Sequence, residues 1–83
     1  MTSLVRTPKQ LGEAIRRYRQ VAKLNQAQLA TKAGLRQATV SEVEGGNGAT
    51  RIETISKLLA ALDLELTVVP RSKGFNQDIE DIF

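Results

Sequence analysis

The sequence contains no cysteine and no histidine. Without thiols it cannot hold a disulfide scaffold, an iron–sulfur cluster or a thiolate zinc site. Without imidazole it also lacks the commonest general base and a frequent metal ligand. We therefore expect no bound metal, no cofactor and no catalytic residue.

The sequence also lacks other motifs that are typical of enzymes. The loop of residues 45–48 is glycine-rich, but neither the lysine nor the preceding strand of a phosphate-binding loop accompanies it. Glu42 and Glu44 lie two residues apart in an expected helix, so their carboxylates cannot face one another as a catalytic pair. The sequence predicts a binding protein and not an enzyme.

Long apolar runs are absent as well. No stretch approaches the roughly 20 apolar residues that cross a membrane, and residues 1–7 carry no basic cluster followed by an apolar run. We expect a cytoplasmic protein.

The chain has 83 residues, of which 41% are apolar and 25% are charged. This length fits one domain, and the composition is that of a globular protein. So small a domain buries only about 60% of its unfolded surface. A compact helical core or a partner chain must supply the rest of its stability.

Charge is divided unevenly along the chain. Residues 1–62 carry ten lysines and arginines against four acids, a net +6, whereas residues 63–83 carry two against five, a net −3. A basic body suits a polyanion, because each phosphate neutralised by a basic side chain releases a condensed counterion. On charge alone, an ordinary solvated surface explains the pattern equally well.

The first two expected helices have clear start signals. Thr7 as N-cap, Pro8 at the first position and Gln10 as the partner in a capping box predict a helix from residue 8. Asn25 and Gln28 repeat the capping pattern for a second, short helix that should end at Gly34. The apolar positions of both helices recur at helical spacing: Leu11, Ala14, Ile15, Tyr18, Ala22, Leu29, Ala30 and Ala33.

Two further helices follow. Residues 36–44 carry Val40 and Val43 on one face and stop at the loop of residues 45–48. Thr50 and Glu53 predict a third capping box for a fourth helix. Its expected apolar face comprises Ile52, Ile55, Leu58, Leu59 and Leu62.

The pattern changes at residues 64–69, where Leu64, Leu66 and Val68 alternate with their neighbours before Pro70 ends the run. This predicts one β-strand. A lone strand leaves its backbone groups unpaired, so we expect it to pair with the same strand of a second chain. An extended segment lying on the body is the alternative.

Residues 71–83 are polar and acidic, and we expect them to be flexible in the free protein. Ile79, Ile82 and Phe83 are spaced so that they would share one face if this tail became helical against a protein partner. A solvated terminus with incidental apolar residues is the other interpretation.

Residues 26–45 have the internal pattern of a helix-turn-helix. Ala30 supplies the small residue where two crossing helices touch, and Gly34 supplies the sharp turn between them. The shared core would be formed by Leu29, Ala33, Leu35, Val40 and Val43. A plain helical hairpin with accidental spacing is the alternative.

Residues 11–64 resemble the Cro/repressor-like (XRE-type) helix-turn-helix family, through the segments 25–30 and 39–45. The segments 7–12, 37–41 and 64–68 are most similar to HipB-type antitoxins. This resemblance implies a mainly α, four- to five-helix lambda-repressor-like domain whose C-terminal strand pairs across a homodimer. It further implies a cytoplasmic protein of the bacterial nucleoid that binds an inverted-repeat operator, represses its own operon and holds a HipA-type kinase toxin.

Two other functions fit the same sequence. A free-standing phage- or plasmid-type repressor would have the same sequence pattern without a toxin. A pure protein-interaction module could use the same helical body.

The expected domain organisation divides the chain into four parts. Residues 1–6 form an N-terminal arm, and residues 7–62 form the DNA-binding domain. The dimerisation strand occupies residues 63–70, and residues 71–83 form the acidic tail.

The third helix should lie in the major groove of DNA. Gln37 suits adenine, Arg36 suits guanine or a phosphate, and Ser41 can bond several bases. Ala38 and the Thr39 methyl suit thymine methyl groups. Glu42 either accepts a hydrogen bond from cytosine or lowers nonspecific affinity.

Four residues are expected to meet phosphate: Gln26, Lys23, Arg51 and Arg6. Gln26 begins the second helix, where backbone N–H groups and the positive end of the helix dipole attract anions. A routine helix-start residue is the alternative for Gln26, and ordinary surface charge is the alternative for the others. The family resemblance pairs Arg19 with Glu44 as a structural ion pair and has Gln26 brace Gln37.

Overall fold

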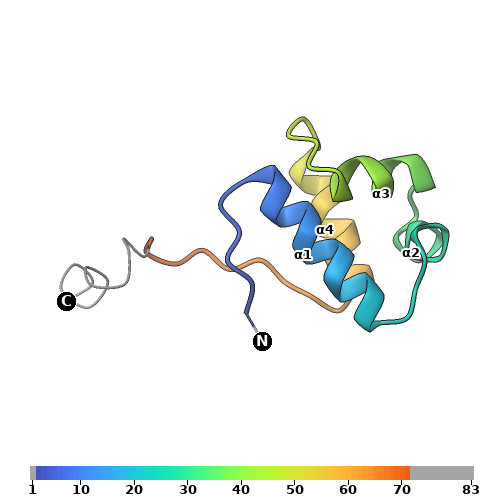
Figure 1. The fold of residues 1–83 in the computed structure, drawn as a ribbon, viewed down its shortest axis with the longest axis horizontal. Coiled ribbons are helices and arrows are strands. Elements are labelled where there is room, and N and C mark those ends of the chain that lie inside the picture. The colour runs from blue at the N-terminus through green and yellow to red at the C-terminus, as the bar shows by residue number, and fades with distance from the viewer. Residues whose placement is uncertain (1, 72–83) are drawn as a thin grey trace.

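The computed structural model describes residues 2–71 and contains four helices in that range. They are α1 (Pro8–Val21), α2 (Gln26–Ala33), α3 (Gln37–Glu44) and α4 (Ile52–Ala61). The helices pack into one body, and the chain runs away from it after α4 (Figure 1). The expected mainly α fold of four to five helices is confirmed, with four helices in this range.

The core lies where all four helices meet. Its largest fully buried side chains come from one residue of each helix: Ile15, Leu29, Val40 and Leu58. No polar or charged residue among residues 2–71 is buried as a whole residue, although the Glu44 side chain is only 4% exposed. Burying each of the four apolar side chains contributes about 1.5–3 kcal/mol, so this four-way contact fixes how α2 and α3 are held.

The predicted helix starts are confirmed at α1 and α2, with one difference. The Thr7 hydroxyl accepts from Gln10 N at 3.1 Å, but the Gln10 side chain accepts from Arg6 N and not from Thr7 N. At α2 the capping box is complete, with Gln28 N bonded to Asn25 at 2.7 Å and Asn25 N bonded to Gln28 at 2.8 Å. Both helices therefore begin at the predicted residue.

The prediction for the start of α4 is wrong. Arg51 is its N-cap and makes no side-chain cap bond, while the Thr50 hydroxyl donates to the Asn47 carbonyl at 3.3 Å. Thr50 is thus part of the loop, where the Asn47 side chain also accepts from Ala49 N at 2.8 Å. Ile52, expected in the core, is 68% exposed, and the buried face of α4 begins at Ile55.

Residues 64–69 form no strand in the single chain that the structure describes. A β-strand is completed by its ladder partner, and residues 2–71 contain no other strand that could be that partner. Leu64 is partly buried against the core, whereas Leu66 and Val68 are 53% and 99% exposed. Of the three predicted dimerisation residues, Leu64 therefore packs against the core of its own chain, and Leu66 and Val68 are exposed to solvent.

Two termini of helices use left-handed residues other than glycine. Lys23 follows α1 with φ 61° and Asp63 follows α4 with φ 58°. Both turns are closed by backbone bonds, from Leu24 N to the Arg19 carbonyl and from Leu64 N to the Leu59 carbonyl.

In the described part of the chain, no helix is long and apolar enough to cross a membrane.

Candidate DNA-binding surface

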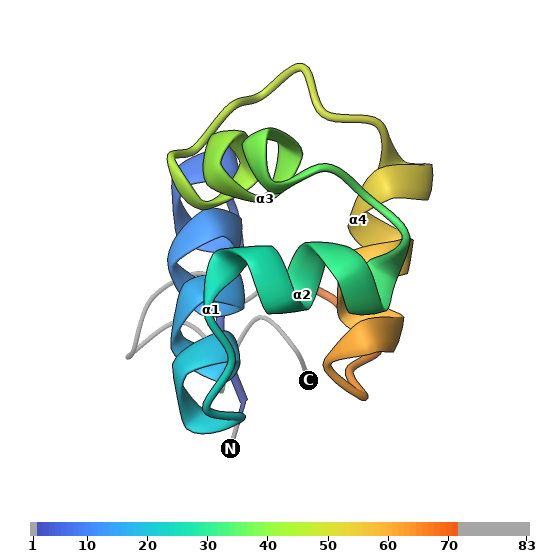
Figure 2. The ribbon, with the colours of Figure 1, turned by 90° about the vertical axis from the view of Figure 1, so that its right-hand side faces the viewer.

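The turn between α2 and α3 sets the geometry of the candidate surface. Gly34 ends α2 in the left-handed conformation with φ 72°, and Leu35 N then donates to the Ala30 carbonyl at 2.8 Å. Figure 2 shows α2 crossing in front of α1 and α4, with α3 above it. The two helices therefore share one side of the molecule.

The outer face of α3 is uncovered and carries a mixed set of side chains. Val40 and Val43 are buried, which turns the opposite face outward. That face comprises the exposed residues Gln37, Ala38, Ser41 and Glu42, with exposed Arg36 as the N-cap. An α-helix with its side chains is about 10–12 Å in diameter, which fits the major groove of DNA, about 12 Å wide.

Thr39 is placed differently from the other predicted base-reading residues. Thr39 is half-buried and lies on the flank of α3, between the core and the outer face. The structure thus brings together Arg36, Gln37, Ala38 and Ser41, and leaves Thr39 at the edge of the group.

A hydrogen-bonded network joins the ends of three helices. Arg19 of α1 contacts Glu44 of α3 through two bonds, Nε to Oε2 at 2.7 Å and Nη2 to Oε1 at 3.0 Å. Gln26 Nε2 of α2 donates to the same Oε1 at 3.2 Å. The side chains of Arg19 and Glu44 are 11% and 4% exposed, so this pair is largely shielded from water.

The network fixes the orientation of its members. The hydrogen bond to the Glu44 carboxylate raises the pKa of Arg19, against an opposing effect of burial, and the guanidinium stays charged at every physiological pH. Arg19 also donates to the Leu24 carbonyl at 2.9 Å, just before α2. One N–H of the Gln26 amide is used by Glu44, which leaves its second N–H for an outside acceptor.

The predicted phosphate-binding cations lie on different loops. Lys23 is exposed in the turn before α2, and Arg51 is exposed at the start of α4. Arg6 lines a shallow hollow together with Asn47 and Thr50. The structure therefore places Arg6 beside the loop that leads to α4, and Lys23 beside Gln26.

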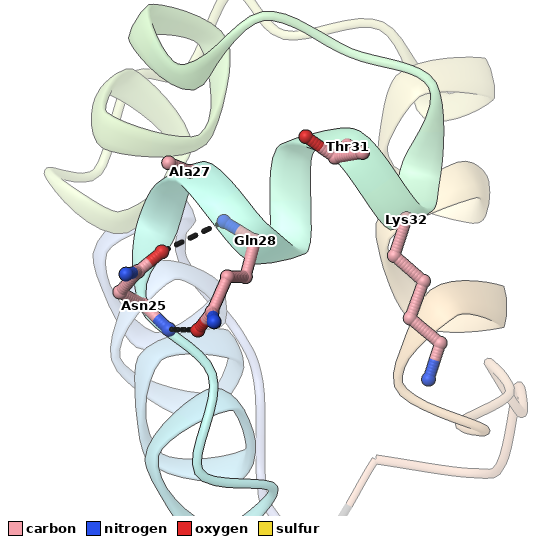
Figure 3. Close-up of a pocket in the computed structure, with 5 residues that line it drawn as sticks. All are labelled: Asn25, Ala27, Gln28, Thr31 and Lys32. Atoms are coloured by element: carbon pink, nitrogen blue, oxygen red, sulfur yellow. Dashed lines mark hydrogen bonds between the residues drawn. The ribbon is translucent and has the colours of Figure 1, made fainter.

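A second shallow hollow lies along α2 (Figure 3), lined by Asn25, Ala27, Gln28, Thr31 and Lys32. Ala27 and Thr31 lie on the α3 side of the helix, whereas Gln28 and Lys32 lie on the opposite side. Asn25 and Gln28 are engaged with one another in the capping box.

Among residues 2–71, no cluster of three or more carboxylates could hold a metal ion.

Sequence reasoning missed the closest contact behind this surface. A Cβ atom at Gly12 of α1 would lie 2.3 Å from the carbonyl oxygen of Val43 and 2.8 Å from that of Glu44. Gly12 is therefore where α1 touches the end of α3. Its glycine was a visible signal, since glycine inside a helical pattern costs about 1 kcal/mol and indicates a packing reason.

Comparison with known proteins agrees with this geometry. A helix-turn-helix family model matches residues 15–69. The chain is also 37% identical over 62 residues to antitoxin HipB of Escherichia coli K12, covering 75% of this chain and 70% of that protein. This chain belongs to the helix-turn-helix family, among the HipB-type antitoxins.

Solved structures of HipB superimpose on this helix-turn-helix protein along most of its length. A complex of HipB with an O4 20mer has a TM-score of 0.77 and 33% identity, covering 83% of this chain and 97% of that one. A HipA-HipB-O2-O3 complex gives a TM-score of 0.77 and 33% identity, with the same coverage of 83% and 97%.

Proposed function

We propose that this chain is a homodimeric antitoxin that binds operator DNA, represses its own operon and binds a HipA-type kinase toxin. The observation that carries the proposal is the uncovered polar face of α3, in a chain 37% identical to antitoxin HipB. HipB has been solved with an O4 20mer, and with HipA and O2-O3, which we interpret as operator DNA. In this proposal the chain acts by binding and not by catalysis.

Base reading is assigned to the exposed residues of α3. Gln37 at the first position can bond adenine N6 and N7 at once, and Arg36 can reach guanine or the adjacent phosphate. Ala38 offers a methyl group to thymine, and Ser41 one turn after Gln37 offers a hydroxyl. The half-buried Thr39 contributes its methyl group at the edge of this set.

Phosphate binding is assigned to Gln26, Lys23, Arg51 and Arg6. Glu44 holds the Gln26 amide at the start of α2, where the helix dipole and free backbone N–H groups also favour an anion. Lys23 lies in the turn before α2, and Arg51 lies at the start of α4. These contacts set the register of the protein on DNA without reading sequence.

The four parts of the chain have separate roles in this proposal. Residues 1–6 form an arm, residues 7–62 bind DNA and residues 63–70 hold the dimer together. The expected contact of Ile79, Ile82 and Phe83 with a protein partner falls on residues outside those that the structure describes. We assign residues 71–83 to binding of the toxin and not of DNA, because phosphate would repel their acidic side chains.

A single substitution tests the reading function. We expect Gln37→Ala to weaken binding to the operator upstream of its own gene by about 1–3 kcal/mol, while affinity for random duplex stays the same. Both affinities should fall as salt rises, because counterions are released on binding. Fluorescence anisotropy with both duplexes at two salt concentrations measures these changes.

Gln20→Ala is the matched control, because Gln20 is exposed on α1 and lies outside the α3 face. It should leave both affinities unchanged. Equal losses on operator and random duplex for Gln37→Ala would remove Gln37 from the reading set. Wild-type binding that is absent or indifferent to salt would instead favour a protein-interaction module.

A further inference from the structure

Glu42 is the one acidic side chain on the outer face of α3. It is exposed, and its carboxylate has no hydrogen bond or ion pair within residues 2–71. Glu44, two residues later, is by contrast held by Arg19 and Gln26. The structure thus uses one carboxylate of α3 internally and leaves the other unpaired on the surface proposed to bind DNA.

The position of Glu42 along the helix places it within reach of bases. Glu42 is four residues after Ala38 and therefore on the same side of α3. It is five residues after Gln37, or about 7.5 Å along the helix axis. Base pairs are stacked about 3.4 Å apart, so Glu42 and Gln37 would meet bases about two steps apart.

A carboxylate on this face can pair with few groups of DNA. It only accepts hydrogen bonds, so phosphates, guanine O6 and N7, and thymine O4 all repel it. The amino groups of cytosine and adenine are the donors in the major groove. Adenine places the acceptor N7 beside its amino group, which repels the second carboxylate oxygen, whereas cytosine N4 has no such acceptor on its own ring.

We propose that Glu42 is a specificity-determining residue that accepts a hydrogen bond from cytosine N4 in each half of the operator. This inference rests on the proposed function and adds the identity of one base. A glutamine at residue 42 would offer a donor and an acceptor together, the pair that adenine N6 and N7 satisfy. The base preferred at this position should then change from cytosine to adenine.

The test uses the full chain and a pool of random 20-base-pair duplexes, selected for binding and sequenced. Wild type should enrich an inverted repeat with cytosine at one position of each half-site. Glu42→Gln should enrich the same repeat with adenine at that position and elsewhere unchanged. On the wild-type site, replacing this cytosine should weaken wild type by about 5- to 100-fold and should weaken Glu42→Gln less.

Glu13→Gln is the control, because it removes the same charge from an exposed residue of α1. It should keep the cytosine preference. If Glu42→Gln instead binds every duplex more tightly with no change of preferred base, Glu42 only lowers nonspecific affinity and the inference is overturned. If wild type enriches no duplex at all, the proposed DNA-binding function itself fails, and the inference fails with it.

Discussion

At the scale of single residues, the Arg19–Glu44 pair is the main polar feature behind the surface. Its atoms lie 2.7 and 3.0 Å apart in a two-pronged arrangement, and Glu44 is only 4% exposed. Shielded charges lose hydration, and a buried pair is not strongly stabilising when compared with an apolar replacement. Removing one partner is different, because the other charge is then left shielded and unpaired.

We therefore expect Glu44→Ala to lower the free energy of unfolding by about 3–5 kcal/mol. The substitution leaves the Arg19 guanidinium without its carboxylate and frees the Gln26 amide from its hold at the start of α2. Urea denaturation followed by circular dichroism measures the loss. Arg16→Ala is the control, since Arg16 is exposed on the same helix as Arg19, and it should change stability by no more than about 0.5 kcal/mol.

A double-mutant cycle with Arg19→Ala completes this test. If the two residues act through each other, the double variant should be at least as stable as either single variant, because it leaves no unpaired charge. Strictly additive losses would show that Glu44 stabilises the domain without Arg19.

Gly12 shows how one missing atom allows two helices to meet. In an exposed helix, replacing glycine by alanine stabilises by about 1 kcal/mol. At Gly12 the added Cβ would lie 2.3 Å from the Val43 carbonyl, so α1 and α3 would have to separate. We expect Gly12→Ala to destabilise the protein by about 1–3 kcal/mol, with a lower midpoint in urea.

Gly34→Ala separates this steric effect from backbone strain. At Gly34 nothing lies within 4 Å of an added Cβ, but φ is +72°. Its cost should be about 1 kcal/mol and should come from the left-handed conformation alone. A Gly12→Ala variant as stable as wild type would mean that the helix crossing adjusts freely.

At the scale of elements, local capping signals predicted the starts of two of the four helices, α1 and α2. Asn25 with Gln28, and Thr7 with Gln10, cap helices because their side chains reach backbone groups only a few residues away. The Thr50–Glu53 pattern failed because Asn47 engages the same loop from the other direction. A capping pattern is outweighed when a neighbouring loop residue binds its hydroxyl.

The candidate surface was also predictable only in part: its outward face followed from the sequence, whereas the contacts behind it did not. Periodicity placed Val40 and Val43 inward, and this alone turns Gln37, Ala38 and Ser41 outward. The hydrogen bond from Gln26 to Glu44 and the contact of Gly12 with the end of α3 involve residues 18 or more positions apart. Such contacts depend on how helices cross, which no local pattern specifies.

At the scale of the whole molecule, the division of charge matches a division of tasks. The basic body of residues 1–62 has a net charge of +6 and carries the surface proposed for DNA. After α4 the chain leaves the body (Figure 1), and Val68 and Val69 are 99% and 67% exposed. Exposed β-branched residues on a segment without a ladder partner are the features of a strand completed by a second chain.

A two-fold dimer formed this way explains an inverted-repeat operator, because it sets two copies of α3 about one helical turn of DNA apart or a multiple of it. Proline at residue 67 would remove a possible ladder donor and restrict the backbone of the segment. We therefore expect Thr67→Pro to sediment as a monomer at concentrations where wild type is a dimer, and to bind the full operator more weakly. Thr67→Ala keeps the backbone N–H and should stay dimeric. A Thr67→Pro protein that remains dimeric with unchanged operator affinity would place the dimer interface on another part of the molecule.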